Sequence, residues 1–150
     1  MKEYMVYLIK EEFAIHYYYK SDVLYRFLQE YHDEQSRNDL RMQFNFITKG
    51  FPKESLTSQL IRQPKNTLYK EKRSEFVELG NRHYYIALHI YEKHIKFRCE
   101  TLQDAEELLF ATLRRFYPYI FIVDNHYENY GWISPVRTSS VYNNDEVLYS

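Results

Sequence analysis

The sequence predicts a single α+β domain, in which a mixed, mostly antiparallel β-sheet packs with several α-helices. Three features predict this class. Residues 4–10 are apolar on both alternating faces, helical periodicities follow up to residue 62, and from residue 74 the apolar residues recur with the period of two that is typical of strands. A chain of 150 residues can bury roughly two thirds of its unfolded surface as one domain. We therefore expect one domain over residues 1–150, ending in a loose polar tail at about residues 138–150.

The first half of the chain predicts one strand followed by helices. Residues 4–10 alternate between two apolar sets, as expected for a central strand that is covered on both faces. Ser21 is placed to cap the second helix. Residues 36–48 fit either a strand or a helix, and we favour a helix. The expected helices are residues 11–18, 21–32, 36–48 and 54–62, followed by a polar stretch through Lys70.

Strands dominate the second half of the sequence, with one helix among them. If Ile90 pairs with Ile95, one face of a hairpin is wholly apolar and the other is polar or mixed, so the pattern sets the register. Thr101 and Asp104 form a capping-box pattern before a helix that ends at residue 116. That helix should lie on the apolar hairpin face. The expected strands are residues 74–80, 83–90, 94–99, 119–123 and 131–133.

Charge and cysteine content narrow the classes of function. The chain has 20 Lys and Arg against 21 Asp and Glu, so it has no basic field that would drive general binding to phosphate backbones. The single cysteine, Cys99, excludes an internal disulfide framework and a cysteine-rich zinc site. The sequence has no apolar run with the length of a signal-peptide core or of a membrane span. We therefore expect a cytoplasmic protein that is not bound to a membrane.

The sequence offers no set of residues for catalysis or for holding a metal or cofactor. His83 and His89 share a strand face but lie about 20 Å apart at ~3.3 Å per residue, too far to hold one ion. The glycines are isolated, so no phosphate-binding loop is indicated. Cys99 falls on the apolar side of its strand, where burial makes a thiol inert. We expect no enzyme, no metal and no cofactor.

One alternative function uses the polar hairpin face. Proteins that bind single-stranded nucleic acid often place aromatic rings and cations on a sheet. Tyr85, Lys96 and Arg98 share the polar face of the predicted hairpin and form a faint version of this arrangement. A single-stranded nucleic-acid-binding domain is therefore the second hypothesis.

The most distinctive stretch is the aromatic run that begins in the first predicted helix, EEFAIHYYY at residues 11–19. Phe13, His16 and Tyr17 fall on one helical face, whereas small Ala14, apolar Ile15 and Tyr18 fall toward the other. Only one of these groups can pack on the sheet and second helix. We expect Ala14 and Ile15 to pack and the rings of Phe13 and Tyr17 to be exposed, although the pattern equally allows both rings to belong to the core.

Two stretches carry a family resemblance, YLIKEEFAIHYYYKS at residues 7–21 and YGWISPV at residues 130–136. They resemble the SirA family, the sporulation inhibitors of replication of endospore-forming bacilli. The similarity extends over most of the chain and is weakest at about residues 50–80. It implies a cytoplasmic protein that binds the N-terminal domain (domain I) of the replication initiator DnaA and restrains new rounds of replication, with no catalysis and no cofactor.

The resemblance also implies which residues meet the initiator. They are Phe13 and Tyr17 in the first helix, with Gln43 and Phe46 in the following helical segment. His16 shares the helical face of Phe13 and Tyr17, and we include it in the set. Phe46 stands where a tyrosine is expected, so no hydroxyl is available at that position. In the second stretch, Trp132 and Pro135 are expected to pack and shape a strand edge rather than touch the partner.

Overall fold

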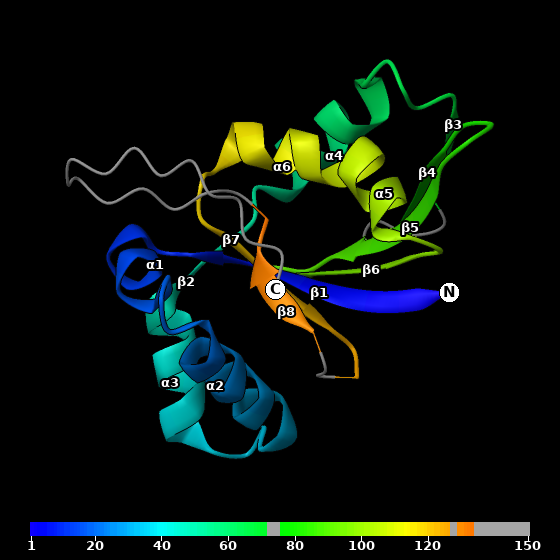
Figure 1. Cartoon of the computed structure of the whole chain (residues 1–150). Coiled ribbons are helices and arrows are strands. Elements are labelled where there is room, and N and C mark those ends of the chain that lie inside the picture. The colour runs from blue at the N-terminus through cyan, green and yellow to red at the C-terminus, as the bar shows by residue number, and fades with distance from the viewer. Residues whose placement is uncertain (72–75, 127–128, 134–150) are drawn as a thin grey trace.

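Figure 1 shows how the helices and strands of the chain are arranged. The structure, a computed structural model, describes residues 1–71, 76–126 and 129–133. Pro135 and the expected tail at residues 138–150 lie outside this part. In chain order the elements are β1 (Lys2–Ile9), α1 (Glu11–Tyr17), α2 (Ser21–Asp33), α3 (Asn38–Ile47), β2 (Thr48–Lys49), α4 (Lys53–Arg62), β3 (Leu68–Glu71), β4 (Phe76–Gly80), β5 (Tyr85–Ile90), β6 (Ile95–Cys99), α5 (Leu102–Ala105), the π-helix η1 (Glu106–Phe110), α6 (Ala111–Phe116), β7 (Ile120–Asp124) and β8 (Tyr130–Trp132). The predicted α+β class is confirmed.

Strand β1 lies in the interior of one antiparallel sheet. The strand order is β3-β4-β5-β6-β1-β7-β8, and the short β2 pairs with the end of β1. One edge of β1 pairs with β6, where Tyr4 faces Phe97, and the other pairs with β7, where Tyr7 faces Phe121. The expected central strand at the start of the chain is therefore confirmed.

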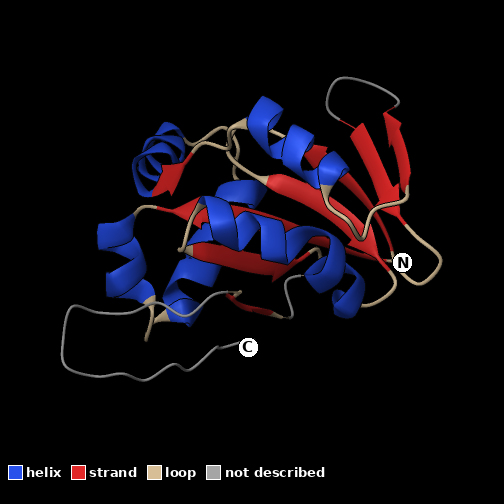
Figure 2. Ribbon diagram, turned by 90° about the horizontal axis from the view of Figure 1, so that it is seen from above, coloured by secondary structure: helices blue, strands red, loops and turns tan. Residues whose placement is uncertain are grey.

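Both faces of β1 are buried, each against a different group of helices. Tyr4, Val6 and Leu8 belong to a core cluster that includes side chains of α4, α5, η1 and α6. Tyr7 and Ile9, on the other face, belong to a second cluster with side chains of α1, α2 and α3. Figure 1 shows these two groups above and below the sheet, and Figure 2 shows the upper group from above. A strand that is apolar on both faces thus requires two helical layers.

The hairpin of β5 and β6 has the register that its apolar pattern predicts. Ile90 pairs with Ile95 and Leu88 with Phe97. These four side chains are at most 2% exposed, and they belong to the core cluster that contains side chains of α5, η1 and α6. The expectation that the helix after the hairpin lies on its apolar face is confirmed.

That helix contains a π-helical turn that the sequence pattern did not predict. The segments α5, η1 and α6 follow one another directly from Leu102 to Phe116. Within the π-helical turn, the carbonyl of Leu108 accepts a hydrogen bond of 2.6 Å from the side chain of Gln63, the residue that follows α4. A π-helical turn interrupts the regular backbone hydrogen bonds of an α-helix. A carbonyl in the turn can then accept a hydrogen bond from a neighbouring side chain. The contact ties α4 to this helix.

Three local expectations are wrong. The stretch before Lys70 is not only polar loop, because β3 begins at Leu68 and pairs with β4. Neither Ser21 nor Thr101 caps a helix with its side chain. The Ser21 hydroxyl instead donates to the carbonyl of Tyr18 and accepts a hydrogen bond of 3.1 Å from the indole of Trp132, which is fully buried as expected. This serine therefore joins the corner between α1 and α2 to strand β8.

Two histidines lie close together where the end of α2 meets the turn between β5 and β6. His32 of α2 hydrogen-bonds the hydroxyl of Tyr7, and the rings of His32 and His94 have centroids 6.1 Å apart. Burial lowers the pKa of both histidines, and the neighbouring His32 and Lys96 also lower the pKa of His94, which falls to about 4. Nearby Asp33 opposes the shift at His32. Both rings are therefore neutral in the folded protein at pH 7.

We predict that the folded protein loses stability between pH 7 and pH 5. The pKa of a histidine is near 6.5 in the unfolded chain, but that of His94 is about 4 in the folded protein. The unfolded chain therefore binds protons first as the pH falls, and the free energy of unfolding drops by about 1–2 kcal/mol. Urea denaturation at pH 7, 6 and 5 would measure this. A His94→Gln variant should lose less stability than the parent protein between pH 7 and pH 5. If the two lose the same amount, His94 is not the cause of the loss.

Candidate protein-binding surface

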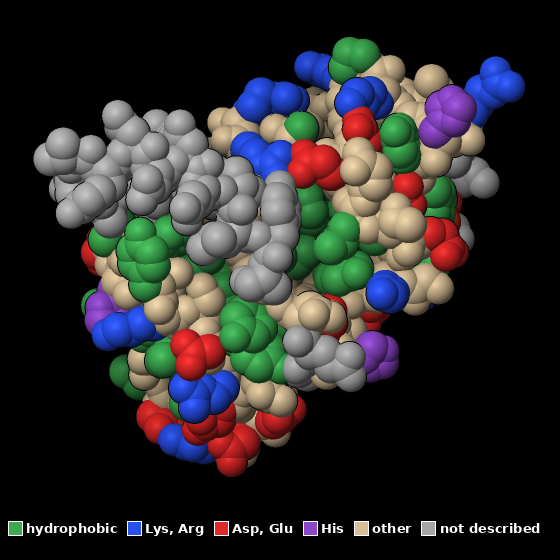
Figure 3. All heavy atoms as spheres, in the orientation of Figure 1, with side chains coloured by type: hydrophobic (Ala, Val, Ile, Leu, Met, Phe, Trp, Pro, Cys, Tyr) green, Lys and Arg blue, Asp and Glu red, His purple; other side chains and the backbone are tan. Residues whose placement is uncertain are grey.

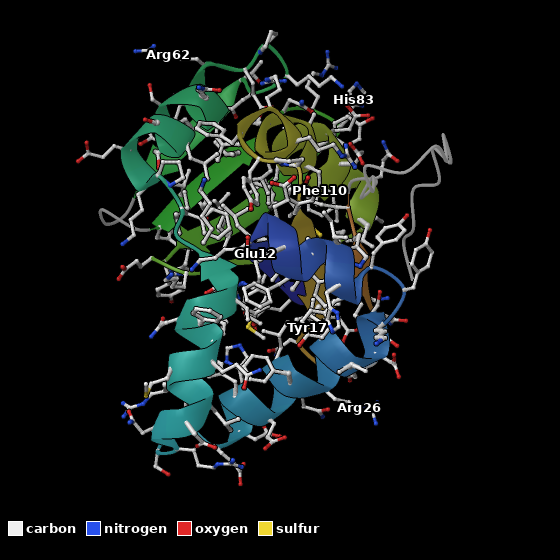
Figure 4. The ribbon with its side chains drawn as sticks, turned by 90° about the vertical axis from the view of Figure 1, so that its left-hand side faces the viewer. Glu12, Tyr17, Arg26, Arg62, His83 and Phe110 are labelled. Carbon is white, nitrogen blue, oxygen red and sulfur yellow. The ribbon has the colours of Figure 1, made fainter. Side chains whose placement is uncertain are left out.

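The start of α1 is fixed against the end of α3 by the backbone. The amide of Lys10 donates a hydrogen bond of 2.9 Å to the carbonyl of Ile47, the last residue of α3. The carbonyl of Lys10 accepts hydrogen bonds from the amides of Phe13 and Ala14, which close the first turn of α1. Figure 4 shows Glu12, near the start of α1, beside the upper end of α3, with Tyr17 farther along toward α2. Side chains of α1 and α3 can therefore meet at this corner.

An aromatic contact joins the two helices. The rings of Phe13 and Phe46 are 5.3 Å apart and meet edge to face, the arrangement that aromatic pairs favour. Phe46 is 64% exposed although it is a large apolar side chain. The ammonium group of Lys10 lies 5.4 Å from the centre of the Phe46 ring. The structure thus brings together Phe13 and Phe46, which lie on different helices.

We use the name α1/α3 surface for Lys10, Phe13, His16, Tyr17, Met42, Gln43 and Phe46. Four of its members are exposed, namely His16, Met42, Gln43 and Phe46. The ring of His16 meets that of Tyr17 edge to face at 4.8 Å. Gln43 lies three residues before Phe46 on α3 and is exposed. Figure 3 shows hydrophobic side chains gathered where Figure 1 places α1.

The packing of α1 corrects two expectations. Ile15 was expected to pack inward, but it is 36% exposed, and Ala14 and Tyr18 are the buried residues of this segment. Phe13 and Tyr17 were expected to be exposed, but both are half-buried and pack against the core beneath α1, α2 and α3. The reason is that residues four apart share a helical face, so burying Ala14 with Tyr18 turns Ile15 outward and leaves the neighbouring rings at the boundary.

Met42 is a member of this surface that the sequence reasoning missed. It is 65% exposed and lies four residues before Phe46, so the two side chains share one side of α3. The buried residues of the same helix are Leu40, Phe44 and Ile47. Two large apolar residues four apart, both outside the buried stripe, were the signal that could have identified it.

The polar hairpin face carries interleaved charges of both signs. The hydroxyl of Tyr85 donates a hydrogen bond of 2.9 Å to the carboxylate of Glu78. Lys96 lies 3.9 Å from the carboxylate of Glu3, whereas Arg98 is exposed. Carboxylates beside these residues oppose the approach of phosphate groups. The arrangement does not favour the nucleic-acid hypothesis.

Side chains that could perform other chemistry are not gathered into a site. Cys99 is buried, and burial, with nearby Asp104 and Glu100, raises the pKa of its thiol to about 12, so it is a poor nucleophile. Among the described residues, no group of three or more His, Cys, Asp or Glu side chains could hold a metal ion. Over the same residues, the structure contains no helix that is both long and apolar enough to span a membrane. The α1/α3 surface is therefore the stronger candidate for function.

Comparison with known proteins gives one family over nearly the whole chain. The model of the family described as "Sporulation inhibitor of replication protein SirA" matches residues 2–137. A protein of the same name from Bacillus subtilis (strain 168) is 27% identical to this chain over 141 residues, which cover 91% of this chain and 95% of that protein. The match includes the residues of the α1/α3 surface.

We predict that Phe46 contributes little to folding, whereas Phe44, two residues earlier, contributes much. Phe44 is 2% exposed and stacks on Tyr31 with ring centres 4.0 Å apart, so Phe44→Ala should cost about 3–5 kcal/mol. Phe46→Ala removes mainly solvent-exposed surface and should cost less than about 1 kcal/mol. Urea denaturation of the two variants provides a matched comparison. A large loss for Phe46→Ala would show that this ring is needed for folding.

Proposed function

The chain belongs to the SirA family of sporulation inhibitors of replication, and we propose that it inhibits replication by binding the N-terminal domain (domain I) of the initiator DnaA through the α1/α3 surface. The observation that carries this proposal is the contact between Phe13 and Phe46. It joins two helices into one aromatic surface that is only partly buried. The family resemblance implies that these same two positions take part in initiator binding, and this implication supports the proposal.

The physical properties of the surface suit a protein partner. Aromatic rings contribute large contact areas at a low cost in conformational entropy, and a few such residues dominate the affinity of many interfaces. Phe13 and Tyr17 pack on one side against the core, so their orientation is fixed before the partner arrives. A fixed orientation reduces the entropy lost on binding. Phe46 and Met42 supply exposed apolar surface beside them.

We further propose that inhibition is steric. The bound inhibitor would cover the surface through which the N-terminal domain of DnaA associates with itself or recruits other proteins. Initiator complexes at the origin would then fail to assemble. This role requires neither catalysis nor a cofactor, in agreement with a family whose name describes a regulatory inhibitor.

We predict that Phe46→Ala, Phe13→Ala and Tyr17→Ala each weaken binding to the isolated N-terminal domain of DnaA. Loss of an aromatic anchor at an interface costs about 2 kcal/mol or more, which corresponds to a dissociation constant raised roughly 30-fold. Calorimetric titration would measure it, after circular dichroism has shown that each variant is folded. Phe46→Ala is the most direct test because that ring is the most exposed of the three.

A matched control for this experiment lies on the opposite helical layer. Leu102 of α5 is also a large apolar residue and is 40% exposed. Leu102→Ala should bind the initiator domain as tightly as the parent protein. If the parent protein shows no binding while both partners are folded, the proposed partner is wrong. If the parent binds and none of the three aromatic variants is weakened, the partner stands and the proposed surface is wrong.

A further inference from the structure

Resting on the proposed function, we infer that Lys10 sets the charge preference of the α1/α3 surface, so that the partner places a carboxylate beside its apolar contact with Phe46. The ammonium group of Lys10 lies 5.4 Å from the centre of this ring. This ring is 64% exposed, more than the half-buried rings of Phe13 and Tyr17. A partner that covers Phe46 must therefore also approach the charge of Lys10.

The charge of Lys10 has no carboxylate partner within the described part of the chain. The acidic residue that follows it, Glu11, accepts a hydrogen bond of 3.0 Å from the hydroxyl of Tyr119. Some other cations are paired with acids, as Arg37 is with Asp39 and Arg114 with Glu106. Lys10 has instead a contact with an aromatic face. Its positive charge is available to a group outside the chain.

The stability of the fold does not require a positive charge at Lys10. Lys10 is the N-cap residue of α1, and its side chain makes no capping hydrogen bond. The N-terminal end of a helix has a positive partial charge, which disfavours a nearby cation. The hydrogen bonds that hold this corner together come from the backbone of Lys10, so any residue other than proline would preserve them. The side chain itself therefore contributes through what it presents at the surface.

A carboxylate is the partner group that fits this arrangement. When an interface excludes water, an ammonium group without an anionic partner loses its hydration and gains nothing in return. A carboxylate would pair with Lys10, and the positive edge of the Phe46 ring would also attract it. An apolar group at the same place would leave the cation buried and unpaired, and a neutral oxygen acceptor would supply a hydrogen bond but no opposite charge. The α1/α3 surface should therefore prefer partners that carry an Asp or Glu next to an apolar side chain.

The experiment compares Lys10→Met with Lys10→Arg in titrations against the N-terminal domain of DnaA at low and high salt. Methionine keeps the apolar stem and removes the charge, whereas arginine keeps both the charge and the contact with the ring. We expect Lys10→Met to raise the dissociation constant about 10-fold and to reduce its dependence on salt. Lys10→Arg should remain within about 3-fold of the parent.

A matched control comes from the next helix. Lys20 is the exposed N-cap residue of α2, also without a capping side-chain hydrogen bond, and Lys20→Met should leave both the affinity and its salt dependence unchanged. Each Asp and Glu of the initiator domain can then be neutralised in turn, and the affinity of each variant measured for the parent protein and for Lys10→Met. We expect one acid whose neutralisation weakens binding to the parent but not to Lys10→Met. This double-mutant cycle would identify the carboxylate.

The outcomes separate the two proposals. If Phe46→Ala weakens binding but Lys10→Met matches the parent at both salt concentrations, the inference about Lys10 is wrong and the proposed function stands. If the folded parent does not bind the initiator domain at all, the proposed function fails and the inference fails with it. If Lys10→Met and Lys20→Met weaken binding equally, the effect is one of general charge and the specific role of Lys10 is excluded.

Discussion

The requirement to bury both faces of β1 determines the rest of the structure. From Tyr4 to Ile9 the strand has apolar side chains on each side and pairs along both edges, so these residues are buried on both faces. One face takes α4 and the helix formed by α5, η1 and α6, and the other takes α1, α2 and α3. The short pairing of β1 with β2 then brings the start of α1 to the end of α3. The α1/α3 surface is thus a consequence of how β1 is covered.

The residues of the α1/α3 surface differ in how much they contribute to the core and how much apolar area they expose. Phe13 packs on the core with part of its ring and meets Phe46 with another part. Phe46 and Met42 are mostly exposed and contribute little to the core. The surface therefore combines a rigid inner part with an exposed outer part. Such an arrangement presents apolar area to a partner without requiring the helices to rearrange.

Elements with a strong period of their own could be predicted from the sequence, and those that depend on distant partners could not. The hairpin register followed from alternating residues such as Leu88 and Phe97.

Strand β3 was missed because its pairing with β4, rather than its own pattern, makes it a strand. The role of Ser21 was missed because its hydroxyl accepts from Trp132, which lies 111 residues away. Ile15 was misplaced because α1 has only seven residues, too few for a pattern to fix its rotation. The helical pattern singled out Phe13 and Tyr17, but Gln43 and Phe46 came from the family resemblance alone, since periodicity could not show that Phe13 and Phe46 touch.

The position of β1 between β6 and β7 also has a consequence for the synthesis of the protein. Tyr4 of β1 pairs with Asp124 of β7. Strand β1 is synthesised first, and its second edge is covered only after β7, one of the last strands, has been synthesised. At a ribosomal rate of about 5–20 residues per second, that interval lasts roughly 6–24 seconds. During this time an apolar strand remains without its final neighbours, and a chain released early would lack the strand that completes the layer beneath α1. Nascent chains would therefore depend on the ribosome or on chaperones for protection, and inhibitory capacity in the cell would follow the number of finished chains.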